Sequence, residues 1–299
     1  MCGIIGLLVR DPAQRQALGS LIVPMFDCMA ERGPDSAGLG VFGEPLDEGL
    51  RRYSLFAPGE RPDWPQLALQ LEEQTGSGGH ITHQDNHAEL ASPIEPGRLR
   101  EFLSTFRPRV ELLGIGRQLD VFKDTGDPAE IARRYDFEHL AGSHCVGHTR
   151  MATESAVSPA HAHPFTAGED FCLVHNGSLS NPYMLRRKLE AEGLHFETDN
   201  DSEAACRLIE WHMRRGESDV RKALEAAIEE MDGFYTLLVA DGRQLTLVRD
   251  AFACKPAVVA ETDAYVAISS EFRSLAHLPG ISQANIFEPL PEVIYSWNV

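Results

Sequence analysis

Cys2 is the residue with the clearest capacity for covalent chemistry, because it directly follows the initiator methionine. Removal of Met1 would give Cys2 both a thiol and a free α-amine, and such an amine ordinarily titrates at about 7.7–8.0. The amine can accept the thiol proton during nucleophilic attack and return it to a leaving amine, as in enzymes with an N-terminal threonine. Taken alone, Cys2 is more simply interpreted as a buried residue at the start of a strand, since free cysteines commonly lie in the core.

Cys2 opens one of five short motifs that are rich in glycine and polar residues. The motifs are Cys2-Gly3-Ile4-Ile5-Gly6, Arg32-Gly33-Pro34-Asp35-Ser36-Ala37-Gly38, Gly147-His148-Thr149-Arg150-Met151-Ala152-Thr153, His175-Asn176-Gly177 and Asp201-Ser202-Glu203. Their order resembles that of the class II glutamine amidotransferases. The resemblance continues through Arg249-Asp250, Lys255-Pro256 and Ser269-Ser270-Glu271. One such motif would be weak support, but five in register are specific.

The resemblance implies an α+β fold, the four-layer αββα sandwich of antiparallel sheets found in N-terminal-nucleophile hydrolases. It implies one amidotransferase domain over residues 2–299, with Cys2 as the nucleophile. The thiolate of Cys2 would attack the side-chain amide of glutamine to form a γ-glutamyl thioester, and water would then release glutamate.

Asn176 and Gly177 match the two groups that stabilise the oxyanion in this family. The side-chain amide of Asn176 and the backbone N–H of Gly177 would donate to the tetrahedral intermediate, and loss of one such donor typically lowers the rate by about 10²–10³. From the dipeptide alone, Asn-Gly after an apolar run is instead typical of a turn.

The same resemblance assigns residues to the two charged groups of the substrate. Arg150 would bind the α-carboxylate of glutamine in two hydrogen bonds, and Asp201 would accept from its α-ammonium. Asp201 also fits the N-cap of a predicted helix, so it could serve both purposes. Thr153 falls beside this site, as does Met151, where many family members have tryptophan.

Residues 32–38 match the mobile glutamine loop of the family, which folds over the substrate and excludes water. The candidates in this loop are Arg32, Gly33, Asp35 and Ser36. The alternative is an ordinary turn, because Gly-Pro-Asp-Ser is a common turn sequence.

Several histidines have a spacing that deserves comparison with metal sites. His80, His83 and His87 surround Asp85, but spacing alone does not establish the converging geometry that imidazole ligands need, so we expect no metal. His161 and His163 precede Pro164-Phe165 in a stretch that resembles the family's Ala-His-Pro, and we interpret them as residues that orient a loop. The six cysteines include no C-x-x-C pair, which argues against a zinc ribbon or a disulfide framework.

Apolar runs and capping residues predict the elements that must position these residues. Strands are expected at residues 3–9, 36–42, 143–150 and 171–175, and a helix from Pro12. Asn181, Asp201 and Ser218 would cap three consecutive helices. Two hairpins follow, one through Asp241-Gly242 and one joining residues 257–260 to 265–269. Antiparallel hairpins beside amphipathic helices favour layered α+β architecture over a doubly wound sheet. Residues 44–139 break this pattern and are interpreted as an insertion.

Composition narrows the functional classes. The 299 residues are 43% hydrophobic and 24% charged, which is ordinary for a globular protein and excludes disorder. The net charge of −18 disfavours a nucleic-acid partner, which requires a basic face. Neither a run of 18 apolar residues nor a signal peptide is present, so we expect a cytoplasmic protein with no membrane association.

Three segments resemble one subfamily in particular. Residues 116–124, 150–156 and 175–181 are similar to the glutamate-synthase-type amidotransferase subunit of N-methylglutamate synthase. The resemblance implies no cofactor in this chain, with a flavin and an iron–sulfur cluster on partner subunits. Residues 249–255 lack the glycine that precedes Lys/Arg-Pro in phosphoribosyl-type members, and Glu154 stands where sugar-type members have histidine, so both of those subfamilies are disfavoured.

The chain also ends directly after the last expected strand, which leaves no acceptor domain for ammonia. We therefore expect it to deliver ammonia from glutamine to a separate glutamate-synthase-like subunit. A free-standing glutaminase is one alternative. The other is a scaffold subunit that keeps the fold but does not hydrolyse glutamine, which the intact set of matched residues disfavours.

Overall fold

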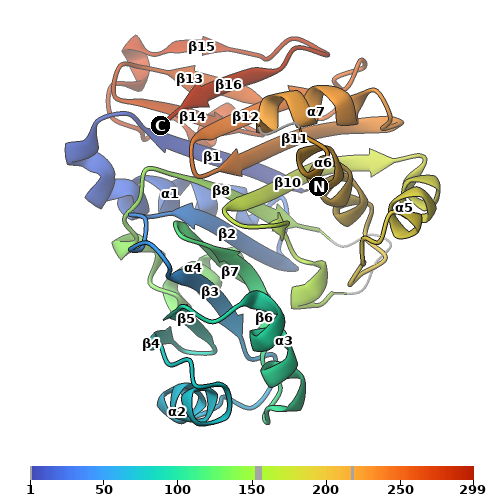
Figure 1. Cartoon of the computed structure of the whole chain (residues 1–299). Coiled ribbons are helices and arrows are strands. Elements are labelled where there is room, and N and C mark those ends of the chain that lie inside the picture. The colour runs from blue at the N-terminus through green and yellow to red at the C-terminus, as the bar shows by residue number, and fades with distance from the viewer. Residues whose placement is uncertain (1, 152–156, 217–218) are drawn as a thin grey trace.

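Two antiparallel sheets packed face to face form the body of the molecule (Figure 1). The computed structural model describes residues 2–151, 157–216 and 219–299. The larger sheet has seven strands in the order β15-β13-β14-β1-β8-β2-β7. Its strands are β1 (Gly3–Val9), β2 (Ser36–Phe42), β7 (Leu119–Thr125), β8 (His144–Arg150), β13 (Val258–Glu261), β14 (Tyr265–Ser269) and β15 (Asn285–Phe287).

The smaller sheet has five strands in the order β16-β12-β11-β10-β9. They are β9 (Phe165–Thr166), β10 (Phe171–Leu179), β11 (Gly233–Asp241), β12 (Gln244–Arg249) and β16 (Tyr295–Asn298). The hairpin expected at Asp241-Gly242 joins β11 to β12, and the Asp241 carboxylate accepts from the backbone N–H groups of Arg243 and Gln244. The second expected hairpin joins β13 to β14.

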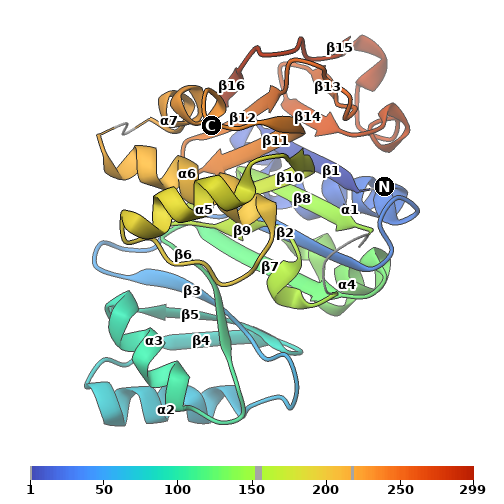
Figure 2. The same cartoon turned by 90° about the vertical axis from the view of Figure 1, so that its right-hand side faces the viewer.

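Alternation along the strands sends side chains to two different cores. Ile4 and Leu8 of β1 pack between the sheets against Val174 and Leu238, whereas the odd-numbered residues of β1 face outward. The outer face of the larger sheet is covered by α1 (Leu18–Ala30) and α4 (Pro128–Arg134). The outer face of the smaller sheet is covered by α5 (Pro182–Ala191), α6 (Asp201–Arg214) and α7 (Val220–Ile228). The result is the expected αββα sandwich (Figure 2).

Part of the segment expected as an insertion forms a separate small sheet with its own core. This inserted subdomain, residues 51–116, projects from one end of the body (Figure 1). Its strands, in the order β4-β5-β3-β6, are β3 (Arg51–Phe56), β4 (His80–Gln84), β5 (His87–Ser92) and β6 (Glu111–Gly116), with α2 (Trp64–Thr75) and α3 (Pro96–Thr105) packed against them. In contrast, β7 and α4 lie within residues 44–139 yet join the body.

Three helix starts differ from the sequence-based expectation. The chain from Pro12 to Ala17 is a 3-10 turn, and α1 begins only at Leu18. Asp201 was expected to cap α6, but Asn200 occupies the cap and accepts from the N–H of Ser202 at 2.9 Å. Either residue type can cap, and Asp201 is instead held by a strand, as described below. The expected cap of α7, Ser218, lies outside the described residues, and Asp219 caps that helix.

Asn176 and Gly177 lie within β10, not in a turn. They pair with Thr236 and Tyr235 of β11 in a continuous antiparallel ladder. The turn reading of this dipeptide is therefore wrong, because pairing with a neighbouring strand overrides the local preference of Asn-Gly.

No helix among the described residues is long and apolar enough to cross a membrane.

Candidate functional site

Cys2 lies at the start of β1, at one end of the space between the two sheets. In the register of β1 with β8, Gly3 is opposite Thr149, which places Cys2 beside Arg150. The thiol of Cys2 is half-buried and lies 3.9 Å from the carbonyl oxygen of Met151. The end of β8 therefore forms one side of the surroundings of the thiol.

Asn176 reaches Cys2 from the opposite sheet. Val174 faces the core between the sheets, so the alternation of β10 sends the side chain of Asn176 to the same side. This side chain is buried, and its Nδ2 donates to the carbonyl oxygen of Cys2 at 3.3 Å. Residues 174 positions apart are thus brought into direct contact.

Position 177 needs a glycine because the backbones of β10 and β11 lie too close together there for a side chain. A Cβ at this position would lie 2.2 Å from the carbonyl oxygen of Phe234 and 2.7 Å from the Cα of Tyr235, both on β11. Any side chain would therefore push β10 and β11 apart, and with them the Asn176 amide next to Cys2.

Arg150 is the last residue of β8, and its side chain is on the same face as Val146, which packs between the sheets. The residue is only 5% exposed. Cys2, Arg150 and Asn176 therefore share the inner faces of the two sheets, at the same end of the sandwich.

Residues 32–36 pack directly against this end. The Nε of Arg32 donates to the carbonyl oxygen of Cys2 at 3.1 Å, while its guanidinium forms an ion pair with Glu271. A Cβ on Gly33 would lie 2.4 Å from the backbone nitrogen of Arg150. The N–H of Asp35 donates to the carbonyl oxygen of Arg150 at 3.0 Å.

The segment continues into β2, where Ser36 is opposite Arg150. Hydrogen bonding to Arg32 is the main cause that lowers the pKa of Glu271, with Arg273 contributing. Glu271 belongs to the matched motif Ser269-Ser270-Glu271, but sequence reasoning gave it no role.

Asp201 contacts β10 two residues beyond Gly177. Its Oδ2 accepts from the backbone N–H of Leu179 at 2.9 Å, and its Oδ1 lies 3.8 Å from Nδ1 of His175. The first turn of α6 is thereby attached to the strand that carries Asn176. Met151 is 40% exposed, and Thr153 lies outside the described residues.

Three buried histidines next to the site were missed as a group by sequence reasoning. His148 and His163 have ring centroids 4.0 Å apart, and His175 follows in β10, hydrogen-bonded to Ser202 at 2.8 Å. Burial lowers the pKa of His148 to about 3 and lowers the pKa values of the other two. All three are therefore neutral at neutral pH. The signal in the sequence was the position of His148 and His175 within two of the five motifs.

The remaining histidine candidates are dispersed. His161 forms a hydrogen bond to Asp199 at 2.9 Å, which links the loop after β8 to the loop before α6. His80 and His83 lie exposed on β4, whereas His87 is buried beside Asp120, and burial lowers its pKa to about 3. The described part of the chain contains no group of three or more His, Cys, Asp or Glu side chains arranged for a metal ion.

Comparisons with known proteins agree with this architecture. The glutamine amidotransferase domain family matches residues 148–277. The glutamine amidotransferase-like protein GlxB of Rhizobium meliloti (strain 1021) is 43% identical over 301 residues, covering 100% of this chain and 98% of that protein. A glutamine–fructose-6-phosphate aminotransferase (isomerizing) of Shewanella oneidensis is 30% identical over 142 residues, covering 48% of this chain and 23% of that protein.

Among solved structures, the glutamine phosphoribosylpyrophosphate amidotransferase from B. subtilis superposes with a TM-score of 0.61 at 17% identity, over 99% of this chain and 49% of that one. This likeness shows the fold of the N-terminal-nucleophile hydrolases. With the relatives above, it shows that the chain belongs to the class II glutamine amidotransferases.

Proposed function

We propose that this protein hydrolyses the side-chain amide of glutamine to glutamate and ammonia, with Cys2 as the nucleophile. The observation that carries the proposal is the contact between the Asn176 amide and the Cys2 carbonyl, at 3.3 Å, across two packed sheets. This contact brings a side-chain N–H donor next to Cys2 and supports an oxyanion role for Asn176.

The proposed reaction uses the N–H donors of Asn176 and Gly177 that could reach the substrate. The sulfur of Cys2 would attack the amide carbon of glutamine, and the carbonyl oxygen would become an oxyanion. A carboxamide nitrogen has two N–H groups, so Asn176 can bond to the Cys2 carbonyl with one and to the oxyanion with the other. The N–H of Gly177 would be the second donor. Collapse of the intermediate would break the C–N bond and release ammonia, and water would then hydrolyse the thioester.

This route requires Cys2 to be the first residue of the mature protein. Its α-amine would accept the thiol proton and transfer it to the departing nitrogen. Arg150 would bind the substrate α-carboxylate and Asp201 its α-ammonium. Residues 32–38, with Arg32, Gly33, Asp35 and Ser36, would form the loop that closes over the site. Met151 and Thr153 would lie beside the bound glutamine.

Glutamate release by purified Cys2→Ala, compared with the unaltered protein, tests the proposal. We expect the variant to lose hydrolysis while its circular dichroism and unfolding midpoint remain unchanged, because the role proposed for Cys2 is chemical. Cys28→Ala, which removes another half-buried thiol, is the matched control and should retain activity. Retention of a tenth of the activity in Cys2→Ala would exclude Cys2 as the nucleophile.

We further propose that the ammonia passes to a separate glutamate-synthase-like subunit, as in N-methylglutamate synthase, whose flavin and iron–sulfur cluster reside on the partner. The support is the similarity of residues 116–124, 150–156 and 175–181 to that subfamily. Co-purification with candidate partner subunits, followed by a coupled assay, tests this. Faster glutamine hydrolysis in the complex would support it. Full turnover by the lone chain, unchanged by saturating partner, would instead favour a free-standing glutaminase.

A further inference from the structure

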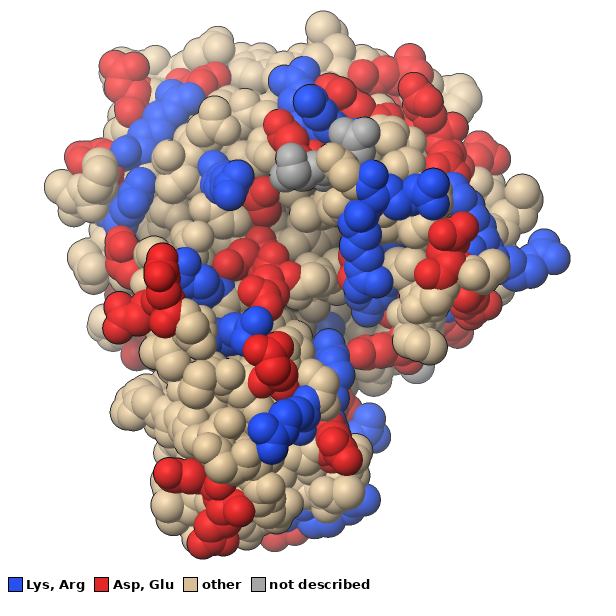
Figure 3. Space-filling view, in the orientation of Figure 1, with Lys and Arg blue, Asp and Glu red and all other residues tan. Residues whose placement is uncertain are grey.

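A cleft of about 830 Å³ lies between the inserted subdomain and the body, and we call it the insertion cleft. Figure 3 shows the surface hollowed where these two parts meet. Helix α3 and strand β6 form one wall, and β9 with the segment leading into α6 forms the other. The volume is within the range of sites for small molecules. Cys2, Arg150 and Asn176 are not among the residues that line it.

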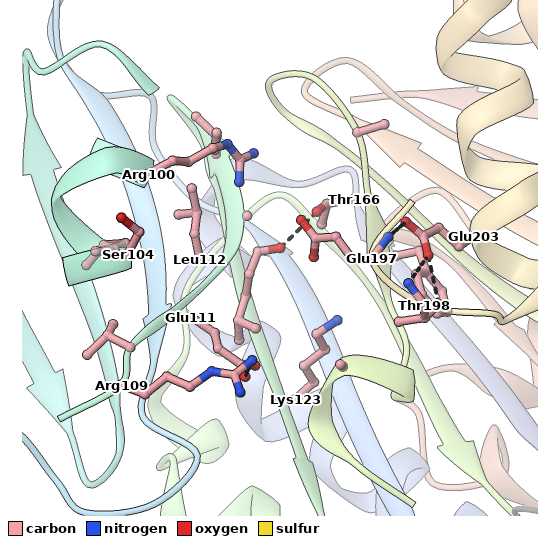
Figure 4. A pocket seen from close by; sticks show the side chains of 18 of the residues that line it. Arg100, Ser104, Arg109, Glu111, Leu112, Lys123, Thr166, Glu197, Thr198 and Glu203 are labelled. Carbon is pink, nitrogen blue, oxygen red and sulfur yellow. Dashed lines mark hydrogen bonds and ion pairs between the residues drawn. The ribbon is translucent and has the colours of Figure 1, made fainter. Parts of the chain in front are cut away.

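Lys123 of β7 lies on the body side of the insertion cleft and is 7% exposed (Figure 4). Its Nζ donates to the carbonyl oxygen of Ala162 at 3.3 Å and lies 5.4 Å from the ring centroid of Phe165. The described residues place no carboxylate within ion-pair distance of it; burial lowers its pKa, and the charges of Glu197, Glu111 and Glu203 act in the opposite direction. An ammonium has three donors, and a buried ammonium without a direct ion pair or a full set of acceptors is unfavourable. Lys123 therefore has donor capacity that the protein itself leaves unused.

A second cation faces the insertion cleft from the opposite wall. Figure 4 shows the side chain of Arg100 extending from α3 into the space across from Glu197. The described residues give Arg100 no ion pair either. Arg109 pairs with Glu111 at 2.8 Å and Arg207 pairs with Glu210 at 2.9 Å, whereas Arg107 donates to two backbone carbonyls of its own segment.

We infer that the insertion cleft binds a small organic dianion, a dicarboxylate or a phosphate monoester, between Lys123 and Arg100. Two cations on opposite walls complement a ligand with negative charge at both ends or on one compact group. Charged hydrogen bonds of this kind are the stronger ones in proteins, and water exclusion at Lys123 strengthens them further. The inference does not depend on glutamine hydrolysis, since no residue of the Cys2 site takes part.

Glu197 provides an additional test, because removing its negative charge should change the affinity for a dianion in the opposite direction from removing a positive charge. This carboxylate is exposed on the wall opposite Arg100 and has no ion pair among the described residues. A like charge near the site opposes a dianion, so removing it should tighten binding. A binding event that merely reflected general attraction to the protein surface would not distinguish Glu197 from other exposed acids.

The experiment is isothermal titration calorimetry of the full chain with two probes, succinate and glycerol 3-phosphate, at low salt. Lys123→Met and Arg100→Ala should each raise the Kd of the bound probe by about tenfold or more, which is the usual cost of losing a charged hydrogen bond. Glu197→Gln should tighten it. Arg98→Ala is the matched control, because Arg98 lies on the same helix, bonds to the Thr75 carbonyl and does not line the cleft.

The two probes distinguish the sources of the dianion: preference for succinate identifies a dicarboxylate site, and preference for glycerol 3-phosphate a phosphate monoester site. Unfolding midpoints show whether each variant is folded. If Lys123→Met does not fold, the surface variants Arg100→Ala and Glu197→Gln decide the matter alone. The inference would be overturned if neither probe bound at about 10 mM. It would also be overturned if Arg98→Ala weakened probe binding as much as Arg100→Ala.

Discussion

At the scale of single residues, the backbone of Cys2 is held by two donors from different elements. Its carbonyl oxygen accepts from Nε of Arg32 at 3.1 Å and from Nδ2 of Asn176 at 3.3 Å. One donor comes from the loop after α1 and the other from β10 of the facing sheet. The backbone of Cys2 is therefore held relative to both sheets, which is the preorganisation that the proposed nucleophilic role of Cys2 would require.

Asn176→Asp should lower kcat for glutamine hydrolysis by about 10²–10³ while changing KM much less, because the donor proposed for the oxyanion would become a negatively charged acceptor. Steady-state glutamate release measures both constants. Asn285→Asp, at an exposed position of β15, is the control and should leave them unchanged. A kcat within a factor of three of the parent would argue against an oxyanion role for Asn176.

Arg150→Lys should raise KM for glutamine, because a single ammonium cannot reproduce the two-pronged contact of a guanidinium with a carboxylate. The same kinetic assay tests this, with the exposed residue Arg243 changed to Lys as the control. An unaltered KM in Arg150→Lys would remove Arg150 from the substrate-binding site.

At the scale of elements, the close packing of β10 against β11 leaves no room for a side chain at Gly177. Gly177→Ala should lower the free energy of unfolding by about 1–3 kcal/mol, because its Cβ would lie 2.2 Å from a β11 carbonyl oxygen and overpacking of this kind forces the backbone to move. Gly59→Ala, where a Cβ meets nothing within 4 Å, is the matched control. Chemical denaturation that showed equal stability for both variants would contradict the close packing described here.

The ion pair between Arg32 and Glu271 joins the loop after α1 to the segment after β14, and it predicts a pH dependence. The folded pKa of Glu271 is lowered mainly by Arg32, so the pair stabilises the fold above the ordinary glutamate pKa and loses this effect as pH falls through the lowered value. Glu271→Gln should therefore cost stability at pH 7, by at most about 1 kcal/mol for a partly exposed pair, and this cost should shrink as pH falls below the ordinary glutamate pKa.

Denaturant unfolding at several pH values, with Glu288→Gln as the exposed control, measures that difference. A cost of Glu271→Gln that stayed constant from pH 7 to pH 3 would show that charge on Glu271 is not its source.

Local patterns predicted most strands of the body because each has a simple apolar signature. Residues 3–9 and 36–42 are strands with those bounds, and the strand expected at 143–150 begins one residue later. The strand expected at 171–175 was too short, since its extension through Asn176-Gly177 depends on pairing with β11, which no local pattern records. The cap of α6 was misplaced for the same reason, because Asp201 is engaged by the distant N–H of Leu179.

At the scale of the whole molecule, the order of the motifs predicted both the αββα sandwich and which distant residues meet. Cys2, Arg150 and Asn176 are brought to one end of the sandwich, as the resemblance implied, while their chemical roles remain predictions. An insertion was expected over residues 44–139, but its separate sheet and its narrower extent were not. Its strand β4 is exposed and polar, so it lacks the apolar alternation by which strands are identified.

The insertion cleft was also beyond sequence reasoning. Lys123 and Arg100 are 23 positions apart; Lys123 lies on β7 of the body and Arg100 on α3 of the inserted subdomain. Only the packing of the inserted subdomain on the body brings them to opposite walls of one cleft. The spacing of these residues along the chain does not predict that they face the same cleft.

The most direct test of the central claim is labelling with 6-diazo-5-oxo-L-norleucine, a glutamine analogue that alkylates an attacking nucleophile, followed by intact-mass and peptide mass analysis. We predict a mature chain that begins at Cys2, a single adduct on the peptide containing Cys2, and loss of glutamine hydrolysis in proportion to labelling. Prior glutamine should protect the site. A chain that retains Met1 yet hydrolyses glutamine, or an adduct on another residue with activity lost in parallel, would contradict the assignment of Cys2 as the N-terminal nucleophile.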